Sequence, residues 1–252
     1  MIDLTGKHVF VVGGSRGIGA ESARVAAKAG ASVTVNYNAN AAAAAGVVQG
    51  IEKGGGKAWS IQADATKDGA LDTAMDEAVR RLGPLHGLVV SAGIFEPMKL
   101  EAMTVEFWER TMSMNLRSTF LAVRAAAKHL RHGKHGGSIV IYTSTAGQRG
   151  SAVFSAYATS KGAQILFMRS MSQELAPDRI RVNCIAPSWT ETEMSTAVMD
   201  GIGRQKILEG CPLGRVGLPA DVANATVFLL SDLAAFITGT TVTVDGGIDM
   251  RG

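Results

Sequence analysis

The sequence predicts an α/β domain built around a parallel β-sheet, and three observations support this class. Apolar runs of strand length alternate with helical segments along the chain, a pattern typical of a parallel sheet covered on both faces. A glycine-rich turn follows the first run. The 252 residues are 46% hydrophobic, and no proline-rich or charge-rich linker divides them. We therefore expect one domain over residues 1–252.

Apolar runs separated by helical segments are expected to form the strands. In chain order they are Lys7–Val12, Ser32–Asn36, Lys57–Ile61, His86–Ser91, Ser138–Thr143, Ile180–Ile185 and Thr241–Val244. Because helices connect parallel strands, the crossovers should be right-handed.

The segments between these runs are expected to form helices. They are Gly17–Ala29, Ala41–Lys53, Asp68–Leu82, Val105–Arg131, Ala156–Leu175 and Ala220–Leu230. Gly30 should end the first helix. Residues 188–219 have the least regular pattern. They follow a predicted strand, and loops at the carboxyl ends of such strands line the ligand crevice, so this stretch is expected to be a substrate lid.

The composition argues against several kinds of partner. The net charge is +3, without a basic stripe interleaved with aromatic residues, so we expect no nucleic-acid partner. No signal-peptide pattern and no uninterrupted apolar segment of about 18 residues is present, so we expect no membrane span. Cys184 and Cys211 fit a reducing compartment, which favours a cytoplasmic protein. Cys184 lies in an apolar run and should fill the core.

The segment from Gly13 to Gly19 has the composition of a nucleotide-binding turn. It reads Gly-Gly-Ser-Arg-Gly-Ile-Gly, between the first predicted strand and the first predicted helix. Glycine lets the backbone turn tightly and approach a pyrophosphate, and the helix N-terminus supplies free N–H groups. An ordinary glycine-rich turn is the competing interpretation, which the position in the chain disfavours.

The end of the second strand indicates which dinucleotide binds. An acidic residue there would bond the adenosine ribose and repel a 2′-phosphate, but Asn36, Tyr37 and Asn38 include no acid. Arg16 lies beside the phosphate turn and can pair with that extra phosphate, or it is a solvated residue at the helix start. We therefore predict NADP as the cofactor in preference to NAD.

Tyr157 and Lys161 stand four residues apart, and Ser144 lies thirteen residues before the tyrosine. On a helix, Tyr157 and Lys161 share one face. A nearby ammonium lowers the pKa of a phenol, which is about 10 when unperturbed. A serine hydroxyl can donate to a carbonyl oxygen that gains charge. The triplet predicts a proton-transfer device, with a chance pair on a helix surface as the alternative.

Together these residues resemble the classical short-chain dehydrogenase/reductase family, and most of all its 3-oxoacyl-[acyl-carrier-protein] reductase-like branch. The motifs are the glycine turn, Ser144, Tyr157 and Lys161 at the family spacing, and the C-terminal Val244-Asp245-Gly246-Gly247. The resemblance covers essentially the full length. It implies a single Rossmann-type, doubly wound domain with a seven-stranded parallel sheet, and usually a homotetramer with paired long helices.

The resemblance also implies roles for residues outside these motifs. Asn115 matches the catalytic asparagine that holds a water linking Lys161 to solvent protons, and a kink or cap of the long helix is compatible with this role. Asp64 and Ala65 match a pair that contacts the adenine, although Asp64 is also a candidate helix N-cap. Thr192 matches a threonine at the nicotinamide amide, or is a loop hydroxyl bonded to backbone. The expected cofactor-binding residues are Gly13, Ser15, Arg16, Gly17, Ile18, Gly19, Tyr37, Asn38, Asp64, Ala65, Ser91, Ala92, Gly93, Tyr157, Lys161, Pro187, Thr190 and Thr192.

Three positions depart from the family pattern. Val12 stands where the family usually has threonine, Ser91 where it has asparagine, and Ser188 where it has glycine. Val12 and Ser91 remove polar groups that tie adjacent strands together, and Ser188 adds a side chain at a tight turn. We expect them to alter the details of the cofactor site and not the fold.

The expected reaction is reversible hydride transfer between NADPH and the carbonyl carbon of a small ketone or secondary alcohol. Tyr157 exchanges the proton with the oxygen, Ser144 orients that oxygen, and Lys161 lowers the tyrosine pKa and can bind the nicotinamide ribose. A 3-oxoacyl-[acyl-carrier-protein] reductase is the alternative within this class. An NADP-binding regulator with little turnover is the rival class, motivated by the three departures.

The substrate is less constrained by the sequence. Residues in loops expected near the crevice are Phe95, Gln148, Phe154, Trp189, Met194 and Met199. They suit an apolar, adaptable pocket, although core or subunit packing is the commoner role for such residues.

An acyl-carrier substrate would need a basic docking surface. Arg124, Lys128, Arg131 and Lys134 are candidates for it, with a solvated helix face as the simpler account. His129, His132 and His135 invite a metal interpretation, but no acidic or cysteine ligand is adjacent. We therefore expect no metal, and cations that close a helix C-terminus instead.

Overall fold

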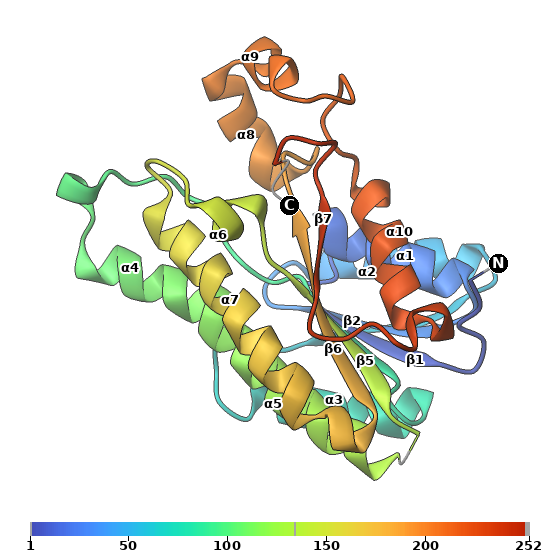
Figure 1. The fold of residues 1–252 in the computed structure, drawn as a ribbon. Coiled ribbons are helices and arrows are strands. Elements are labelled where there is room, and N and C mark those ends of the chain that lie inside the picture. The colour runs from blue at the N-terminus through green and yellow to red at the C-terminus, as the bar shows by residue number, and fades with distance from the viewer. Residues whose placement is uncertain (1, 134, 250–252) are drawn as a thin grey trace.

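The structure is a computed structural model that describes residues 2–133 and 135–249. Its centre is one sheet of seven parallel strands in the order β3-β2-β1-β4-β5-β6-β7 (Figure 1). The strands are β1 His8–Val12, β2 Ser32–Tyr37, β3 Lys57–Gln62, β4 Gly87–Val90, β5 Gly137–Tyr142, β6 Ile180–Pro187 and β7 Thr241–Val244. The predicted Rossmann-type, seven-stranded fold is confirmed.

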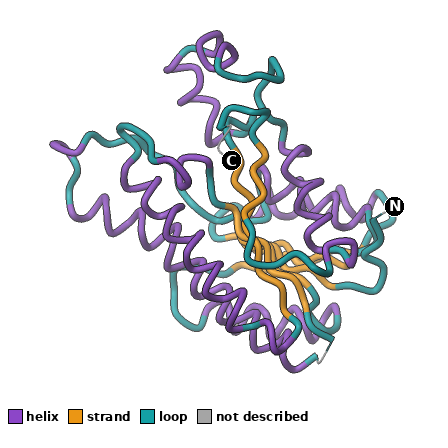
Figure 2. Tube along the Cα trace, viewed as in Figure 1, coloured by secondary structure: helices purple, strands orange, loops and turns teal. Residues whose placement is uncertain are grey.

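Helices cover both faces of the sheet, as Figure 2 shows. They are α1 Gly17–Lys28, α2 Ala41–Lys53, α3 Ala70–Leu82, α4 Val105–Met112, α5 Ser118–His132, α6 Thr145–Arg149, α7 Ser155–Glu174, α8 Glu193–Ile202, α9 Arg204–Glu209 and α10 Pro219–Leu230. Shorter turns are η1 Leu100–Ala102, η2 Ser113–Arg117, η3 Ala176–Asp178 and η4 Asp232–Ala234. One apolar cluster joins the sheet to α3, α5 and α7. A second joins it to α1, α2 and α10. The predicted core role of Cys184 is confirmed, since it is fully buried in the first cluster.

The long helix expected over 105–131 is interrupted, which corrects that prediction. Residues 113–117 form a π-helical turn between α4 and α5. Ser118 Oγ donates to the Met114 carbonyl and Thr119 Oγ1 to the Asn115 carbonyl, at 2.6 and 2.7 Å. Hydroxyl groups that bond to carbonyls one turn back are known to bend helices. The interruption therefore follows from two polar residues that the periodicity argument ignored.

Residues 188–219 are more regular than the sequence suggested, because they contain α8 and α9. Thr192 caps α8 through the Ser195 N–H, and Ser195 Oγ accepts from the Thr192 N–H in return. Met199, Ile207 and Cys211 form a small apolar cluster of their own. In Figure 1 this segment projects beyond the end of the sheet.

The sheet has a topological switch point between β1 and β4. From β1 the chain builds outward through β2 and β3, and from β4 it builds in the opposite direction. The loops after β1 and β4 therefore open next to each other, where ligands bind in sheets of this kind. Within residues 2–133 and 135–249, no helix is long and apolar enough to cross a bilayer.

Candidate active site

The glycine turn after β1 packs too tightly for side chains. Gly13 has a φ of 73°, and a Cβ there would lie 2.8 Å from the Ala92 nitrogen in the loop after β4. A Cβ on Gly19 would lie 2.4 Å from the Gly13 carbonyl oxygen. Such approaches require glycine. The turn thus joins the two loops at the switch point.

Asn36, at the end of β2, fastens this turn. Its carbonyl accepts from the Gly14 N–H at 2.9 Å, and its Nδ2 donates to the Ala63 carbonyl at 3.1 Å. The side chain is almost fully buried. In the sequence, Asn36 is notable only because it is not the acidic residue that would bind the adenosine ribose. A polar residue inside an apolar strand was the signal that it supports the backbone.

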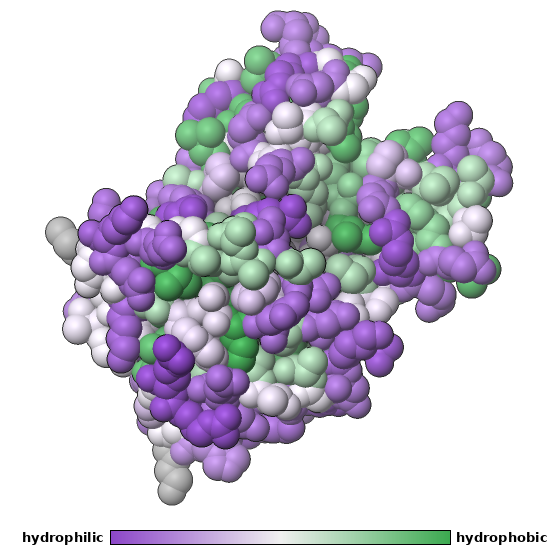
Figure 3. All heavy atoms as spheres, turned by 180° about the vertical axis from the view of Figure 1, so that it is seen from behind, coloured by the Kyte–Doolittle hydropathy of each residue, from purple (hydrophilic) through white to green (hydrophobic). Residues whose placement is uncertain are grey.

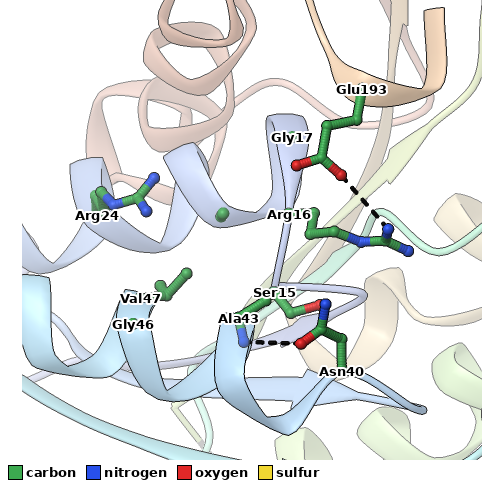
Figure 4. Close-up of a pocket in the computed structure, with 10 residues that line it drawn as sticks. Ser15, Arg16, Gly17, Arg24, Asn40, Ala43, Gly46, Val47 and Glu193 are labelled. Carbon is green, nitrogen blue, oxygen red and sulfur yellow. Dashed lines mark hydrogen bonds and ion pairs between the residues drawn. The ribbon is translucent and has the colours of Figure 1, made fainter.

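A hollow opens beside the glycine turn (Figure 4). Its lining residues include Ser15, Arg16, Gly17, Arg24, Asn40, Val47 and Glu193. Arg16 Nη1 lies 3.5 Å from Glu193 Oε2 on α8, and both side chains are mostly exposed. The glycine cradle, the N-terminus of α1 and two arginines fit the phosphate groups of a dinucleotide.

Asp64 is placed near the end of β3, and it does not cap a helix. Its Oδ1 accepts from the N–H and the hydroxyl of Thr66, at 2.9 and 2.7 Å. Helix α3 starts later, at Ala70, with Gly69 as its N-cap. The N-cap interpretation of Asp64 is therefore wrong, while the adenine contact of Asp64 and Ala65 stays a prediction.

Thr192 brings the lid close to the glycine turn. A Cβ on Gly17 would lie 3.4 Å from the Thr192 methyl group. The Thr192 hydroxyl accepts from the Ser195 N–H as the α8 cap, which is the backbone-bonded alternative considered from the sequence. Its contact with a nicotinamide amide stays a prediction.

Ser188 and Val12 are accommodated without disturbing the fold. Ser188 Oγ donates to the Asp245 carbonyl at 3.2 Å, beside Pro187 at the end of β6. Val153 and Arg179 are the non-glycine residues of the described chain with positive φ, so Ser188 needs no left-handed turn. Val12 is fully buried in the sheet core.

Ser144, Tyr157 and Lys161 meet at the carboxyl end of β5. Ser144 is the N-cap of α6, its Oγ accepting from the Ala146 N–H at 3.1 Å, and its side chain is hydrogen-bonded to Tyr157. A Cβ on Gly147 would lie 2.6 Å from the Lys161 carbonyl carbon. The absence of that Cβ lets α6 press against α7. Neither Gly147 nor the short helix α6 was foreseen from the sequence.

Lys161 lies beneath the tyrosine ring. Its Nζ is 5.7 Å from the Tyr157 ring centroid and donates to the Tyr142 carbonyl at 2.8 Å. Burial lowers the pKa of Lys161 to about 8. The side chain is almost fully buried, so the ammonium is held among protein groups and not in bulk water.

The pKa of Tyr157 moves opposite to the expectation. Burial raises it to about 12, and the hydrogen bond with Ser144 opposes the shift. We expected Lys161 to lower this pKa. Removing the phenolate from water is the dominant cause, and Lys161 directs its hydrogen bond at a main-chain carbonyl. In this structure Tyr157 therefore carries its proton at neutral pH.

Asn115 occupies the π turn and is fully buried. Its Oδ1 accepts from the Ile94 N–H at 2.8 Å, and its Nδ2 donates to Ser160 Oγ at 2.9 Å. Gln164 Nε2 donates to the Asn115 carbonyl at 2.9 Å. The structure thus confirms that Asn115 lies at a helix irregularity. Its water-holding role stays a prediction, and Gln164 is a neighbour that the sequence analysis missed.

Comparison with known proteins agrees with this geometry. A family model described as enoyl-(acyl carrier protein) reductase matches residues 12–249. A short-chain type dehydrogenase/reductase from Mycobacterium ulcerans superposes with a TM-score of 0.94 at 33% identity, over 99% of this chain and 92% of that one. The chain belongs to the short-chain dehydrogenase/reductase family. It is an oxidoreductase of that family.

Relatives of this short-chain dehydrogenase/reductase carry different names. The 3-oxoacyl-[acyl-carrier-protein] reductase of Chlamydia pneumoniae is 33% identical over 98% of both chains. Glucose 1-dehydrogenase 2 of Bacillus subtilis (strain 168) is 34% identical over 98% of this chain and 96% of its own. Because these two names specify unlike substrates, family membership leaves the substrate open.

Aromatic residues gather around the tyrosine of this short-chain dehydrogenase/reductase. Phe95 stacks on Phe154 with ring centroids 4.4 Å apart, and meets Tyr157 edge to face at 4.8 Å. Trp189 meets Phe95 at 6.0 Å. Three of the predicted substrate residues are thus brought together.

The other candidate substrate residues have different contacts. Gln148 Nε2 donates to Thr243 Oγ1 at 3.2 Å. Met194 is half exposed on α8. Met199 is fully buried in the lid cluster, which confirms the core interpretation for that residue.

The basic residues considered for docking are paired with acids. Arg124 and Lys128 on α5 both contact Asp72, and Arg131 Nε lies 2.6 Å from Asp178 Oδ2. Lys134 lies outside the described residues. Their charges are therefore largely compensated.

The three histidines point to different partners. His129 Nε2 lies 3.3 Å from Asp76 Oδ1, His132 Nδ1 lies 2.6 Å from the Lys128 carbonyl, and His135 stacks on His86 at 4.1 Å. In the part of the chain that the structure describes, no group of three or more histidine, cysteine or acidic residues gathers as metal ligands do.

Proposed function

We propose that this chain interconverts a ketone and a secondary alcohol with NADP(H), and that Tyr157 is its acid and base. The observation that carries the proposal is the meeting of Ser144, at the start of α6, with Tyr157 and Lys161 on α7, where the two helices pack closely at Gly147. A binding module has no need of such a device.

The residues divide the work of a reduction between them. A bound reduced nicotinamide supplies the hydride to the carbonyl carbon. Tyr157 transfers its proton to the carbonyl oxygen, so that the ketone gains one hydride and one proton. Ser144 donates a hydrogen bond to the same oxygen and orients it. The ammonium of Lys161 then stabilises the phenolate until a solvent proton replaces the one transferred.

The pKa of about 12 supports the reductive direction at neutral pH, because Tyr157 is then protonated and ready to donate. Oxidation needs the phenolate, which burial disfavours.

Arg16 and Arg24 support the choice of NADP. Both line the hollow beside the glycine turn, and no acid stands at residues 36–38. Two guanidinium groups there suit a 2′-phosphate. Glu193 pairs with Arg16 and would have to release it to the phosphate.

A 3-oxoacyl-[acyl-carrier-protein] reductase is the second candidate, favoured by the Chlamydia pneumoniae relative. Pairing of Arg124, Lys128 and Arg131 with acids weakens it, since an acidic carrier protein needs free cations. The rival NADP-binding regulator would bind the cofactor tightly without turnover.

The proposal includes one domain over residues 1–252, a lid at 188–219 and a homotetramer. Phe120 on α5 and Leu166 on α7 are 43% and 64% exposed, and pairing of these helices between copies would cover them. Buried, unpaired Cys184 and Cys211 suit a reducing, cytoplasmic setting.

The test is NADPH oxidation, followed by its absorbance, over ketones, sugars and acetoacetyl thioesters. We expect turnover with simple ketones. A strong preference for the thioester, lost at high salt, would favour the carrier-protein reductase. Tight NADPH binding without turnover of any substrate would contradict the proposal and favour the regulator.

A further inference from the structure

The rings around Tyr157 come from three separate loops at the carboxyl end of the sheet. Phe95 follows β4, Phe154 precedes α7, and Trp189 follows β6. Phe95 lies in the middle, 4.4 Å from the Phe154 centroid, 4.8 Å from that of Tyr157 and 6.0 Å from that of Trp189. An aromatic wall therefore stands directly beside the phenol.

This wall is separate from the cores that hold the sheet to its helices. Among the described residues, Phe95 and Phe154 belong to neither of the two large apolar clusters. Phe95 and Trp189 remain partly exposed, and Trp189 also packs against the small lid cluster of Met199, Ile207 and Cys211. Figure 3 shows the molecule from behind. Apolar surface lies in the recess between the α8–α9 segment at the top and the second projection at the upper right. The cluster keeps apolar area available at the site.

The backbone holds the wall in place at a conformational cost. Val153, just before Phe154, has a φ of 57°, in the left-handed region that β-branched residues rarely adopt. Its carbonyl accepts from the Met98 N–H at 2.7 Å, which ties the loop of Phe154 to the loop of Phe95. Strain that the surrounding structure maintains is characteristic of functional sites.

The charged side chain next to the aromatic wall, that of Glu96, is paired with a cation. Glu96 follows Phe95 directly and is paired with Arg110 on α4, whose Nη1 donates to Glu96 Oε1 at 3.2 Å. A substrate group in this region would meet ring faces and edges and not a free carboxylate. Hydroxyl-rich or charged substituents packed against these rings would lose water without gaining hydrogen bonds from them, which is unfavourable.

We propose that the substrate carries a flat hydrophobic ring close to its carbonyl group, and that Phe95 is the residue that selects it. This inference rests on the proposed function and narrows its substrate class. Contacts between aromatic rings contribute about 0.5–1.5 kcal/mol beyond the burial of area, which corresponds to a preference of up to about tenfold.

The test compares three ketones of equal carbon number, 4-phenyl-2-butanone, 4-cyclohexyl-2-butanone and 2-decanone. Two methylene groups separate each ring from the carbonyl, so intrinsic reactivity is matched. With NADPH we expect kcat/KM to be up to about tenfold higher for the phenyl ketone than for 2-decanone, with the cyclohexyl ketone between them.

The variant Phe95→Leu should bring the ratio of kcat/KM for the phenyl ketone to that for 2-decanone down to about one, whatever happens to the absolute rates. Phe154→Leu is the second variant if the first does not fold. Phe236→Leu is the control, since Phe236 is fully exposed and precedes β7, at the opposite end of the sheet. It should keep the wild-type preference.

The outcomes separate this inference from the proposed function. Equal kcat/KM for the three ketones, or a phenyl preference that survives in Phe95→Leu, overturns the inference and leaves the function standing. If no carbonyl is reduced, the function fails, and calorimetric binding of 4-phenyl-2-butanone decides the inference alone. Binding that is tighter than that of 2-decanone and lost in Phe95→Leu supports it, and equal or absent binding overturns it.

Discussion

At the amino end of the sheet, His8 is enclosed on β1, with its two ring nitrogens 2.9 Å from the Gly83 carbonyl and from Thr34 Oγ1. At the carboxyl end, Lys161 is also buried, while Tyr157 is partly exposed next to the ring of Phe95. Burial lowers the pKa of His8 to about 4 and that of Lys161 to about 8. A shifted pKa therefore does not identify an active site by itself.

The difference lies in what surrounds the buried groups. The imidazole of His8 has partners at both nitrogens and is 1% exposed, so its shift affects stability. Around Tyr157 the structure keeps accessible apolar surface and a strained backbone at Val153. Such a region is built for a ligand and not for maximum stability. The following predictions test this contrast between the two ends.

Among the variants that contrast the two ends, the largest effect is expected for Lys161→Met. Loss of the ammonium should lower reductive turnover by about 10² or more, in the range of acid–base groups. In the wild type, kcat/KM should fall as the pH rises through about 8, because the charged form of Lys161 exists below its pKa. The Lys161→Met variant should not show this decline of kcat/KM near pH 8.

Lys128→Met is the matched control for the pH profile, because Lys128 is exposed on α5 and paired with Asp72. It should keep the decline near pH 8. A decline that persists in Lys161→Met would assign the step to another group.

The amino end should respond to pH through stability. Above pH 6.5, His8 is neutral in both the folded and the unfolded chain. As the pH falls from 6.5 to about 4, the His8 imidazole becomes protonated in the unfolded chain but stays neutral in the folded one. The free energy of unfolding should therefore drop by about 3 kcal/mol. Urea unfolding across this pH range measures the drop.

In His8→Gln, whose amide does not titrate, this decline should shrink. His132→Gln, on an exposed position of α5, should leave the decline unchanged. An unaltered pH slope in His8→Gln would remove His8 from this account.

Arg16→Ala should weaken NADPH binding about tenfold and leave NADH binding nearly unchanged, since a charge-assisted bond to the 2′-phosphate contributes about 1.5 kcal/mol or more. Glu193→Gln removes the competing partner of Arg16 and should not weaken NADPH binding. Fluorescence titration of both cofactors measures these affinities. Equal losses for NADPH and NADH would mean that Arg16 supports the turn and does not recognise the phosphate.

The smallest effect concerns the strain at the carboxyl end. Val153→Asn should raise the free energy of unfolding by about 1 kcal/mol, because asparagine tolerates the φ of 57° far better than valine. Val105→Asn is the comparison, at an exposed valine that begins α4 without positive φ. It should give no gain. A stability loss in Val153→Asn would show that the valine side chain contributes more than the strain costs.

Local patterns in the sequence were sufficient to predict the sheet and to single out Ser144, Tyr157 and Lys161 as one group. An apolar run such as Thr241–Val244 indicates a strand without any knowledge of tertiary contacts. The same is true of the spacing of Ser144, Tyr157 and Lys161, and the structure brings these three side chains together.

Features that depend on packing were missed. The pKa of Tyr157 is raised because neighbouring segments bury the phenol, and the hydrogen bond with Ser144 only partly opposes the shift. Three contacts join segments that are distant in sequence or belong to different elements. They are the hydrogen bond from Asn36 to Ala63, the hydrogen bond from Gln164 to Asn115, and the close approach of Gly147 to Lys161. Spacing along one chain does not reveal such neighbours.

The most direct test of the account is Tyr157→Phe, which removes the proton and keeps the ring. NADPH affinity and the single-turnover rate of NADPH oxidation with a ketone would be measured on the same preparation. We predict a rate lower by about 10³, with NADPH affinity within about twofold of the wild type. A rate close to that of the wild type would show that another group supplies the proton and would contradict the account.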